Sequence, residues 1–161
     1  MVRALARSPE LAIAFTQVGA VLFKSGALCA VDRELAILAC GACYDAPYET
    51  AQHGPISRSV GVSEEQRAAV AARRWGDPAF SVEQRALLRF VAAAAASPTV
   101  PSHVFDSVTE HYDDRQVVEA VFVTGYYFLL ARLTTVLNIP IDPPPDDRVL
   151  RAMLGSEQPD N

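Results

Sequence analysis

Apolar residues recur along the chain every three or four positions, and no segment alternates between apolar and polar residues as a half-buried strand does. The first periodic segment opens at Pro9 and stops near Gly26. It would place four apolar side chains on one helix face: Leu11, Phe15, Val18 and Leu22. The next segment, 33–44, is apolar nearly all round, so we expect a buried helix at the centre of an all-α protein.

Capping signals locate the next helices along the chain. Asp32 is expected to cap the helix over 33–44, because a carboxylate can accept the free N–H groups of a first turn. Pro47 suits the start of a third helix, which would end at Gly61. Ser63 with Gln66 has the spacing of a capping box and predicts a fourth helix.

The second half of the chain follows the same pattern. Ser81 with Gln84 repeats the capping-box spacing, and the helix that it opens would run to Ser97. A short helix is expected after Pro101, and a long one over about 114–137, which Pro140 would end. We predict one domain over 1–161, in which 140–161 is an extended, proline-rich tail that could add a helical turn at 148–154.

Composition narrows the class of protein. Half of the 161 residues are hydrophobic and only 20% are charged, which leaves apolar surface for a partner subunit. The net charge of −5, with no basic cluster, argues against nucleic acid as a partner. The most apolar stretch, 117–130, contains Glu119 and is flanked by Arg115 and Arg132, so we expect no membrane span. With no resemblance to a signal peptide, the sequence predicts a cytoplasmic, soluble protein.

The three cysteines offer a first candidate chemistry. Cys40 and Cys43 form a Cys-x-x-Cys pair that could be redox-active. Both lie in the second half of their helix, however, where the helix dipole opposes a thiolate, so we favour buried core residues. No second cysteine or histidine pair completes a zinc site, and we expect no metal.

Glu49 and His53 offer a second candidate chemistry. On a helix that starts at Pro47 they lie one turn apart, where the carboxylate could orient the imidazole as a general acid or base. A surface ion pair has the same spacing. Glu34, in the first turn of the buried helix, either interacts with the helix dipole or reaches the same pocket.

Several of these positions occur together in one known motif. Arg33 and Leu35 open the buried helix, Tyr48, Glu49 and His53 follow after a short turn, and then come Gly61 and the acidic helix start at 63–65. This order resembles the carboxymuconolactone decarboxylase and alkylhydroperoxidase D-like superfamily, over 32–144. The resemblance implies an alkylhydroperoxidase D-like helical bundle and an obligate oligomer, a homotrimer or homohexamer with sites near its subunit interfaces.

The resemblance also indicates a type of reaction. The peroxidase-like branch carries its two cysteines where this chain has Ala46 and Glu49, and a proton-relay glutamate where it has Glu34. Because this chain lacks both of those cysteines, the resemblance implies acid-base chemistry without a cofactor. His53 would be the acid or base, with Glu49 orienting it and Glu34 in support. The leading expectation is a decarboxylase of a small oxygenated carboxylic acid or lactone, in aromatic catabolism or specialised-metabolite biosynthesis.

Other readings stay open at this point. They are a thiol peroxidase or disulfide reductase using Cys40 and Cys43, an isomerase or cyclase, and an oligomeric binding protein without catalysis. Four further side chains are candidates to contact a small-molecule substrate: Tyr48, Tyr126, Arg132 and Cys43. Alternatively, Tyr126 and Cys43 are packing residues, and Arg132 pairs with an acid such as Glu119.

Overall fold

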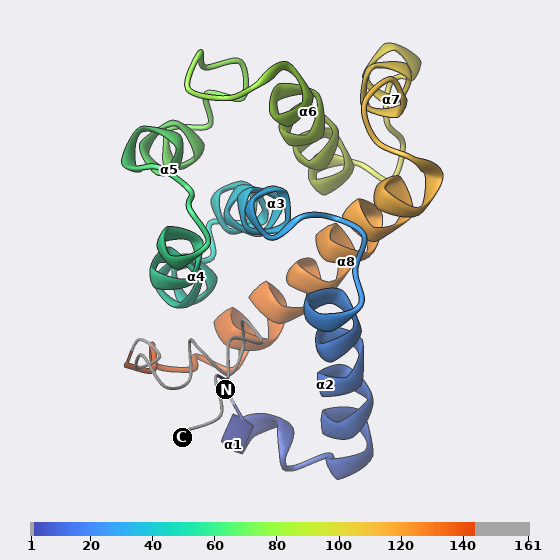
Figure 1. The fold of residues 1–161 in the computed structure, drawn as a ribbon. Coiled ribbons are helices and arrows are strands. Elements are labelled where there is room, and N and C mark those ends of the chain that lie inside the picture. Colours follow the sequence, from blue (N-terminus) through green and yellow to red (C-terminus); the bar gives the residue numbers. More distant parts are fainter. Residues whose placement is uncertain (1, 144–161) are drawn as a thin grey trace, which may run out of the picture.

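The computed structural model describes residues 2–143, and within that range it contains helices and no strands (Figure 1). The expected all-α class is therefore confirmed. The helices in chain order are α1 (Val2–Leu5), α2 (Pro9–Lys24), α3 (Ala30–Cys43), α4 (Pro47–Ser59), α5 (Glu64–Ala71), α6 (Val82–Ala96), α7 (Ser102–Thr109) and α8 (Asp114–Val136).

Helix α3 is the centre of the molecule. Figure 1 shows it nearly end-on, with α4, α5, α6 and α8 arranged around it. Five consecutive or near-consecutive side chains of α3 are at most 1% exposed, as an all-round apolar helix requires: Leu35, Ala36, Ile37, Ala39 and Cys40. The predicted burial of this segment is confirmed.

The start of α3 differs from the prediction. The helix begins at Ala30, and its cap is Cys29, whose Sγ accepts the Asp32 N–H at 3.4 Å. Asp32 already lies in the first turn, where its carboxylate accepts hydrogen bonds from Tyr112 (3.0 Å) and Gln84 (3.2 Å). The expected cap is therefore wrong, because this acid links α3 to α6 and to the segment between α7 and α8 instead of capping a helix.

The other boundaries agree closely with the capping signals. Both predicted capping boxes are present, at the starts of α5 and α6, and Asp113 with Gln116 makes a third at the start of α8. Helix α4 opens at Pro47 and ends at Ser59, two residues before Gly61, whose φ of +103° turns the chain toward α5. The short α1 has no counterpart in the prediction.

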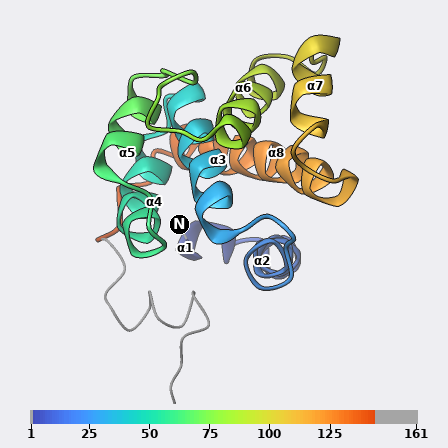
Figure 2. The same cartoon turned by 45° about the horizontal axis from the view of Figure 1, so that its top comes forward.

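Helix α2 packs less fully than its pattern suggested. Of the four side chains expected to share a buried face, only Leu22 is buried, and Leu11 is 67% exposed. Figure 2 shows α2 nearly end-on at one side of the bundle. Phe15 makes its main contact with α8, stacking on Tyr126 with ring centroids 4.3 Å apart. The pattern identified the helix correctly, but several of its apolar side chains are largely exposed: Leu11, Ile13, Val18 and Val21.

Helix α8 is long and apolar enough to cross a membrane by length and composition. One face of it packs on α3, α4 and α6, as a core helix does. The other face carries large apolar side chains that are 44% to 58% exposed: Val118, Val121, Phe122, Phe128 and Leu129. After α8 the chain continues without helix to residue 143, and the helical turn predicted at 148–154 lies outside the described residues.

The buried position of Leu88 on α6 gives a test of the core. Leu88 is fully buried, so Leu88→Ala leaves a cavity and should lower the free energy of unfolding by about 2–5 kcal/mol. Val82→Ala, on the same helix but at a 55% exposed position, should cost less than about 0.5 kcal/mol. Urea denaturation followed by circular dichroism measures both, and equal losses would contradict the described packing.

Candidate functional site

His53 lies on α4 with its imidazole turned toward the central helix α3. Its Nδ1 is 2.9 Å from Oε2 of Glu34, and both residues are buried. An ionised carboxylate can only accept, so Nδ1 carries the proton in this pair and Nε2 has a free lone pair. The sequence left two readings for Glu34, and the structure places it against the imidazole.

Tyr127, on α8, occupies the other side of the imidazole. Its hydroxyl is 2.9 Å from His53 Nε2, and the two rings meet edge to face. Burial, followed by the nearby charge of Glu34, raises the pKa of Tyr127 well above its ordinary value of 10, so the phenol keeps its proton and donates to Nε2. Three helices thus supply one hydrogen-bonded chain, Tyr127 to His53 to Glu34.

Glu49 does not orient His53, although the two share a helix. Its Oε1 accepts the Thr134 hydroxyl at 3.1 Å, and its Oε2 is buried with no hydrogen-bond partner. Burial raises the pKa of the Glu49 carboxyl above its ordinary value of 4.5. The orienting role that the sequence favoured for Glu49 is therefore filled by Glu34, and Glu49 is a separate acidic group in the site.

These groups meet at a cavity of about 400 Å³ between α2, α4 and α8. Most of its wall is apolar; Glu49, His53 and the tyrosines enter from α4 and α8, and Lys24 enters from α2. A cavity of this size, with a few convergent polar groups, is typical of a small-molecule site. The lining residues are Thr16, Gly19, Ala20, Phe23, Lys24, Tyr48, Glu49, Gln52, His53, Ile56, Tyr126, Tyr127 and Leu130.

Two of the expected substrate contacts, Tyr48 and Tyr126, line this cavity. The Tyr48 hydroxyl donates to the Asp142 carboxylate at 2.6 Å, and the Tyr126 hydroxyl donates to the Phe15 carbonyl at 3.3 Å. A side chain at Gly19 would put a Cβ 2.8 Å from the Tyr126 hydroxyl oxygen, so the ring needs glycine there. Both hydroxyls therefore have protein partners, and the rings mainly shape the wall.

The other two expected contacts, Arg132 and Cys43, do not line the cavity. Arg132 is exposed and lies over the Phe128 ring at 4.7 Å. Glu119 pairs with Arg115 at 3.1 Å, so the alternative pairing of Arg132 with Glu119 is not formed. Cys43 is half-buried and Cys40 is fully buried. Burial raises the pKa of both thiols, which disfavours a reactive thiolate.

Sequence reasoning missed two members of the site. From the sequence, Tyr126 was named as a substrate contact and Tyr127 was not. The helical period through Ala120, Val123 and Leu130 nevertheless places Tyr127 on the buried face of α8. Thr134 continues the same face and reaches Glu49. The α2 wall could not be foreseen, because its place over α4 depends on tertiary packing.

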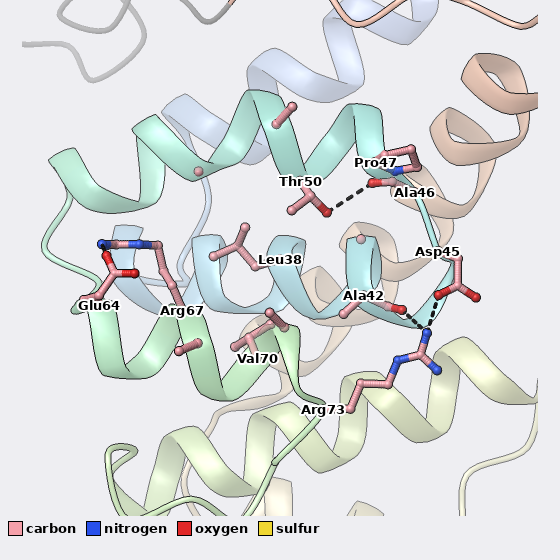
Figure 3. Close-up of a pocket in the computed structure, with 15 residues that line it drawn as sticks. Leu38, Ala42, Asp45, Ala46, Pro47, Thr50, Glu64, Arg67, Val70 and Arg73 are labelled. Atoms are coloured by element: carbon pink, nitrogen blue, oxygen red, sulfur yellow. Dashed lines mark hydrogen bonds and ion pairs between the residues drawn. The ribbon is translucent and has the colours of Figure 1, made fainter.

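A second and larger cavity, of about 810 Å³, lies between α4 and α5 over α3 (Figure 3). Its wall consists mostly of small side chains, and its charged groups are paired within the protein. Arg73 reaches the Ala42 carbonyl and Asp45, and Arg67 pairs with Glu64. It includes neither His53 nor Tyr127, so the acid-base groups belong to the smaller cavity alone.

No three His, Cys, Asp or Glu side chains between residues 2 and 143 are grouped so that they could hold a metal ion. Separately, the hydrogen-bonded chain Tyr127–His53–Glu34, called the relay below, and the carboxyl group of Glu49 can transfer protons.

Comparison with known proteins supports the fold and the family. The sequence model of the carboxymuconolactone decarboxylase family matches residues 9–93, which include α2, α3, α4 and most of the relay. No curated protein sequence matches the chain.

Several solved structures share the fold. The debrominase Bmp8 in complex with 2,3,4-tribromopyrrole is 16% identical, with a TM-score of 0.76 over 94% of this chain and 79% of that one. An alkylhydroperoxidase AhpD core protein, peroxidase-related, from Ralstonia eutropha JMP134 is 24% identical, with a TM-score of 0.74 over 93% and 78%. A peroxidase-related protein from Silicibacter sp. TM1040 is 19% identical, with a TM-score of 0.76 over 92% and 77%.

The raised pKa of Glu49 predicts a pH-dependent stability. The folded state holds this proton at pH values where the unfolded chain has lost it, so the stability that it contributes is complete below about pH 4.5 and is lost as the pH rises through the folded pKa. Glu49→Gln removes this loss. The melting temperature of the variant minus that of the wild type should therefore grow from acid to neutral pH, and a constant difference would show an ordinary carboxyl.

Proposed function

The chain belongs to the carboxymuconolactone decarboxylase family, and we propose that it is a cofactor-free acid-base enzyme. The observation that carries the proposal is the hydrogen-bonded chain from Tyr127 through His53 to Glu34, which ends at the wall of an apolar cavity. Buried polar groups are costly unless they are paired, and a paired, buried relay of titratable groups beside a cavity is typical of a catalytic site.

The relay can deliver a proton and take one up. With Nδ1 protonated toward Glu34, Nε2 can accept the Tyr127 phenol proton while the phenol oxygen takes one from a ligand carbon, which leaves His53 as the imidazolium. In the reverse direction, an imidazolium protonated from solvent returns its Nε2 proton to the phenol oxygen as the phenol gives its own proton to the ligand. Glu34 stabilises the imidazolium that forms if His53 takes up a proton. The group that meets the ligand is then the Tyr127 hydroxyl or, if the phenol turns away, His53 Nε2.

Glu49 supplies a second acid on the same cavity. Its raised pKa keeps the carboxyl protonated to higher pH than usual, and its Oε2 has no partner, so it can donate a hydrogen bond to a ligand oxygen. The relay and Glu49 both lie on the cavity wall. This arrangement suits a ligand whose carbonyl oxygen gains charge at Glu49 while a carbon exchanges a proton with the relay.

Decarboxylation of a small oxygenated carboxylic acid or lactone is the leading reaction. The bond to the carboxylate breaks, its electron pair moves onto a conjugated carbonyl as an enolate, and CO₂ leaves. The enolate then takes one proton at carbon from the relay, which solvent replenishes. A mostly apolar wall favours this step, because the carboxylate charge is dispersed as the bond breaks. Isomerisation and cyclisation would use the same acid-base groups on a different ligand.

No observation favours the thiol alternative. Cys40 is 0% exposed, and neither Cys40 nor Cys43 lines the cavity that holds His53. The imidazole already has partners on both ring nitrogens, so it is not placed to activate a thiol.

Loss of the imidazole gives the direct test. His53→Gln should lower turnover by about 10²–10⁴-fold, as expected when a general acid-base group is lost, while circular dichroism shows the fold intact. The assay is CO₂ release from a panel of small oxygenated acids and lactones, with the wild type defining the substrate. Arg132→Gln, an exposed change outside the cavity, is the matched control and should keep wild-type turnover.

The double variant Cys40→Ala with Cys43→Ala separates this reading from thiol chemistry. It should keep most of the turnover, because neither thiol reaches the cavity. If the double variant is inactive and His53→Gln is active, the acid-base assignment is wrong.

We also propose that the chain assembles with copies of itself, as a trimer or hexamer. The support is the exposed apolar surface of α8 and α2, where Phe122 and Leu129 on α8 and Leu11 and Val21 on α2 are 49% to 67% exposed. Large apolar side chains exposed to this degree on two helices are the kind of surface that a subunit interface covers.

A charge placed on this surface tests the assembly. Light scattering of the wild type should give a mass that is a multiple of three chains of 17.4 kDa. Phe122→Glu should shift the protein to smaller species, because a carboxylate buried in an interface is unpaired. Val82→Glu, equally exposed on α6, should leave the mass unchanged. A monomeric wild type would sink the proposal.

A further inference from the structure

Arg33 carries a buried positive charge that has no counter-ion among the side chains that the structure describes. The residue lies in the first turn of α3 and is 7% exposed, and its Nε is buried without a hydrogen-bond partner. A charge in this state is costly, because the protein interior does not replace the water that it loses. Its field also reaches further than that of a charge in water, because the interior screens it less.

The guanidinium of Arg33 lies against a residue that forms the wall of the His53 cavity. Its carbon is 4.7 Å from the ring centroid of Phe23, and that centroid is 6.2 Å from the centroid of the His53 imidazole. The charge is therefore at most about 11 Å from the imidazole, a range over which charges inside a protein interact. Phe23 lines the cavity and Arg33 does not, so the guanidinium acts on the site through its field.

Two successive residues of α3 thus place opposite charges near the imidazole. Glu34 accepts the hydrogen bond from His53 Nδ1 at 2.9 Å, and its negative charge favours the imidazolium. The relay needs the opposite state, a neutral imidazole whose Nε2 accepts the Tyr127 hydroxyl. A nearby positive charge disfavours a second positive charge on the ring, so Arg33 opposes the effect of Glu34 at the imidazole.

Arg33 also acts on the other end of the relay. Burial, followed by the charge of Glu34, raises the pKa of the Tyr127 phenol, and the positive charge of Arg33 opposes that rise. The same charge therefore makes both the phenol and the imidazolium more ready to release a proton. Both effects favour the direction in which the relay delivers a proton to a ligand.

The other titratable groups around the imidazole do not duplicate this effect. On α4, burial raises the pKa of Glu49 and so disfavours its negative charge. On α3 and α8, burial raises the pKa values of Cys40 and Tyr126, which keeps both groups neutral. Lys24, on α2, is exposed, so water screens its charge. Arg33 is therefore the main positive charge that acts on the relay from within the described structure.

We propose that Arg33 is a positioning residue for the relay, whose charge keeps the resting imidazole neutral and makes the imidazolium a stronger acid when it forms. This rests on the proposed function, because it assigns Arg33 an effect on proton transfer by the same relay. Since Arg33 does not line the cavity, it should affect the rate of the chemical step and leave ligand binding nearly unchanged.

A pH titration of the His53 imidazole, followed by nuclear magnetic resonance, measures the effect of this charge. The chain has three histidines, and the His53 signal is the one that is absent from His53→Gln. In Arg33→Gln the midpoint of the His53 titration should move to higher pH by about 0.5–1 unit, because the imidazolium no longer faces a like charge. His103 and His111 are exposed, and their midpoints should not move.

Three further variants separate the charge of Arg33 from its packing. Arg33→Lys keeps the charge and should keep the midpoint close to that of the wild type. Arg33→Met, whose apolar side chain can still pack on Phe23, should show the same shift as Arg33→Gln. Arg132→Gln is the matched control and should cause no shift, since Arg132 also lies 4.7 Å from an aromatic centroid but outside the cavity.

Both neutral replacements remove an unpaired buried charge, so we expect both variants to fold, as circular dichroism would show. An unmoved midpoint in a folded Arg33→Gln or Arg33→Met protein would overturn the role of Arg33. An equal shift in Arg33→Lys would also overturn it, because the effect would then come from packing. So would an equal shift in Arg132→Gln, which would reflect net charge alone.

Turnover separates this proposal from the acid-base function. Arg33→Gln should lower kcat by about 2- to 10-fold with KM within about twofold of the wild type, and Arg33→Lys should restore most of the loss. A moved midpoint with full turnover in His53→Gln would reject the acid-base function and keep the coupling of Arg33 to His53. An unmoved midpoint with turnover lost in His53→Gln would reject the role of Arg33 and keep the function.

Discussion

The hydrogen bond between Glu34 and His53 is the interaction on which the centre of the molecule depends. Helix α3 is enclosed by other helices, so a carboxylate on it has no access to water and must find its partner inside the protein. His53 supplies that partner from α4 at 2.9 Å, and Tyr127 extends the pairing to α8. The bond that gives Oε2 of the buried Glu34 its partner also holds the reactive groups in register, although Glu34 Oε1 stays buried without a hydrogen-bond partner. Core and site are therefore one structure.

Most helices could be predicted because their start signals are local. A serine and a glutamine three residues apart satisfy each other's backbone donors whatever surrounds them, and both predicted boxes form. The prediction that Asp32 caps α3 was wrong, because its carboxylate accepts hydrogen bonds from Gln84 on α6 and from Tyr112. No local sequence pattern indicates these long-range bonds. Helix α2 was placed correctly in sequence, yet its apolar face finds few neighbours within residues 2–143.

Helical geometry was enough to predict which side chains of α4 face the site, but not which residues they contact. The spacing of Glu49 and His53 does put both on the cavity side of α4, but one turn of helix allows their side chains to diverge. Glu49 accepts a hydrogen bond from Thr134 on α8, and His53 is hydrogen-bonded to Glu34 on α3. The two side chains therefore have different partners.

The sparse packing of α2 has a consequence for how the cavity opens. This helix forms one whole wall, yet only Leu22 on it is buried, so its local unfolding takes far less free energy than opening the α3 core. A ligand that joins α2 to α4 and α8 adds the contacts that the helix lacks in the isolated chain. Binding would therefore complete part of the fold, and slower amide hydrogen exchange along α2 would be its signature.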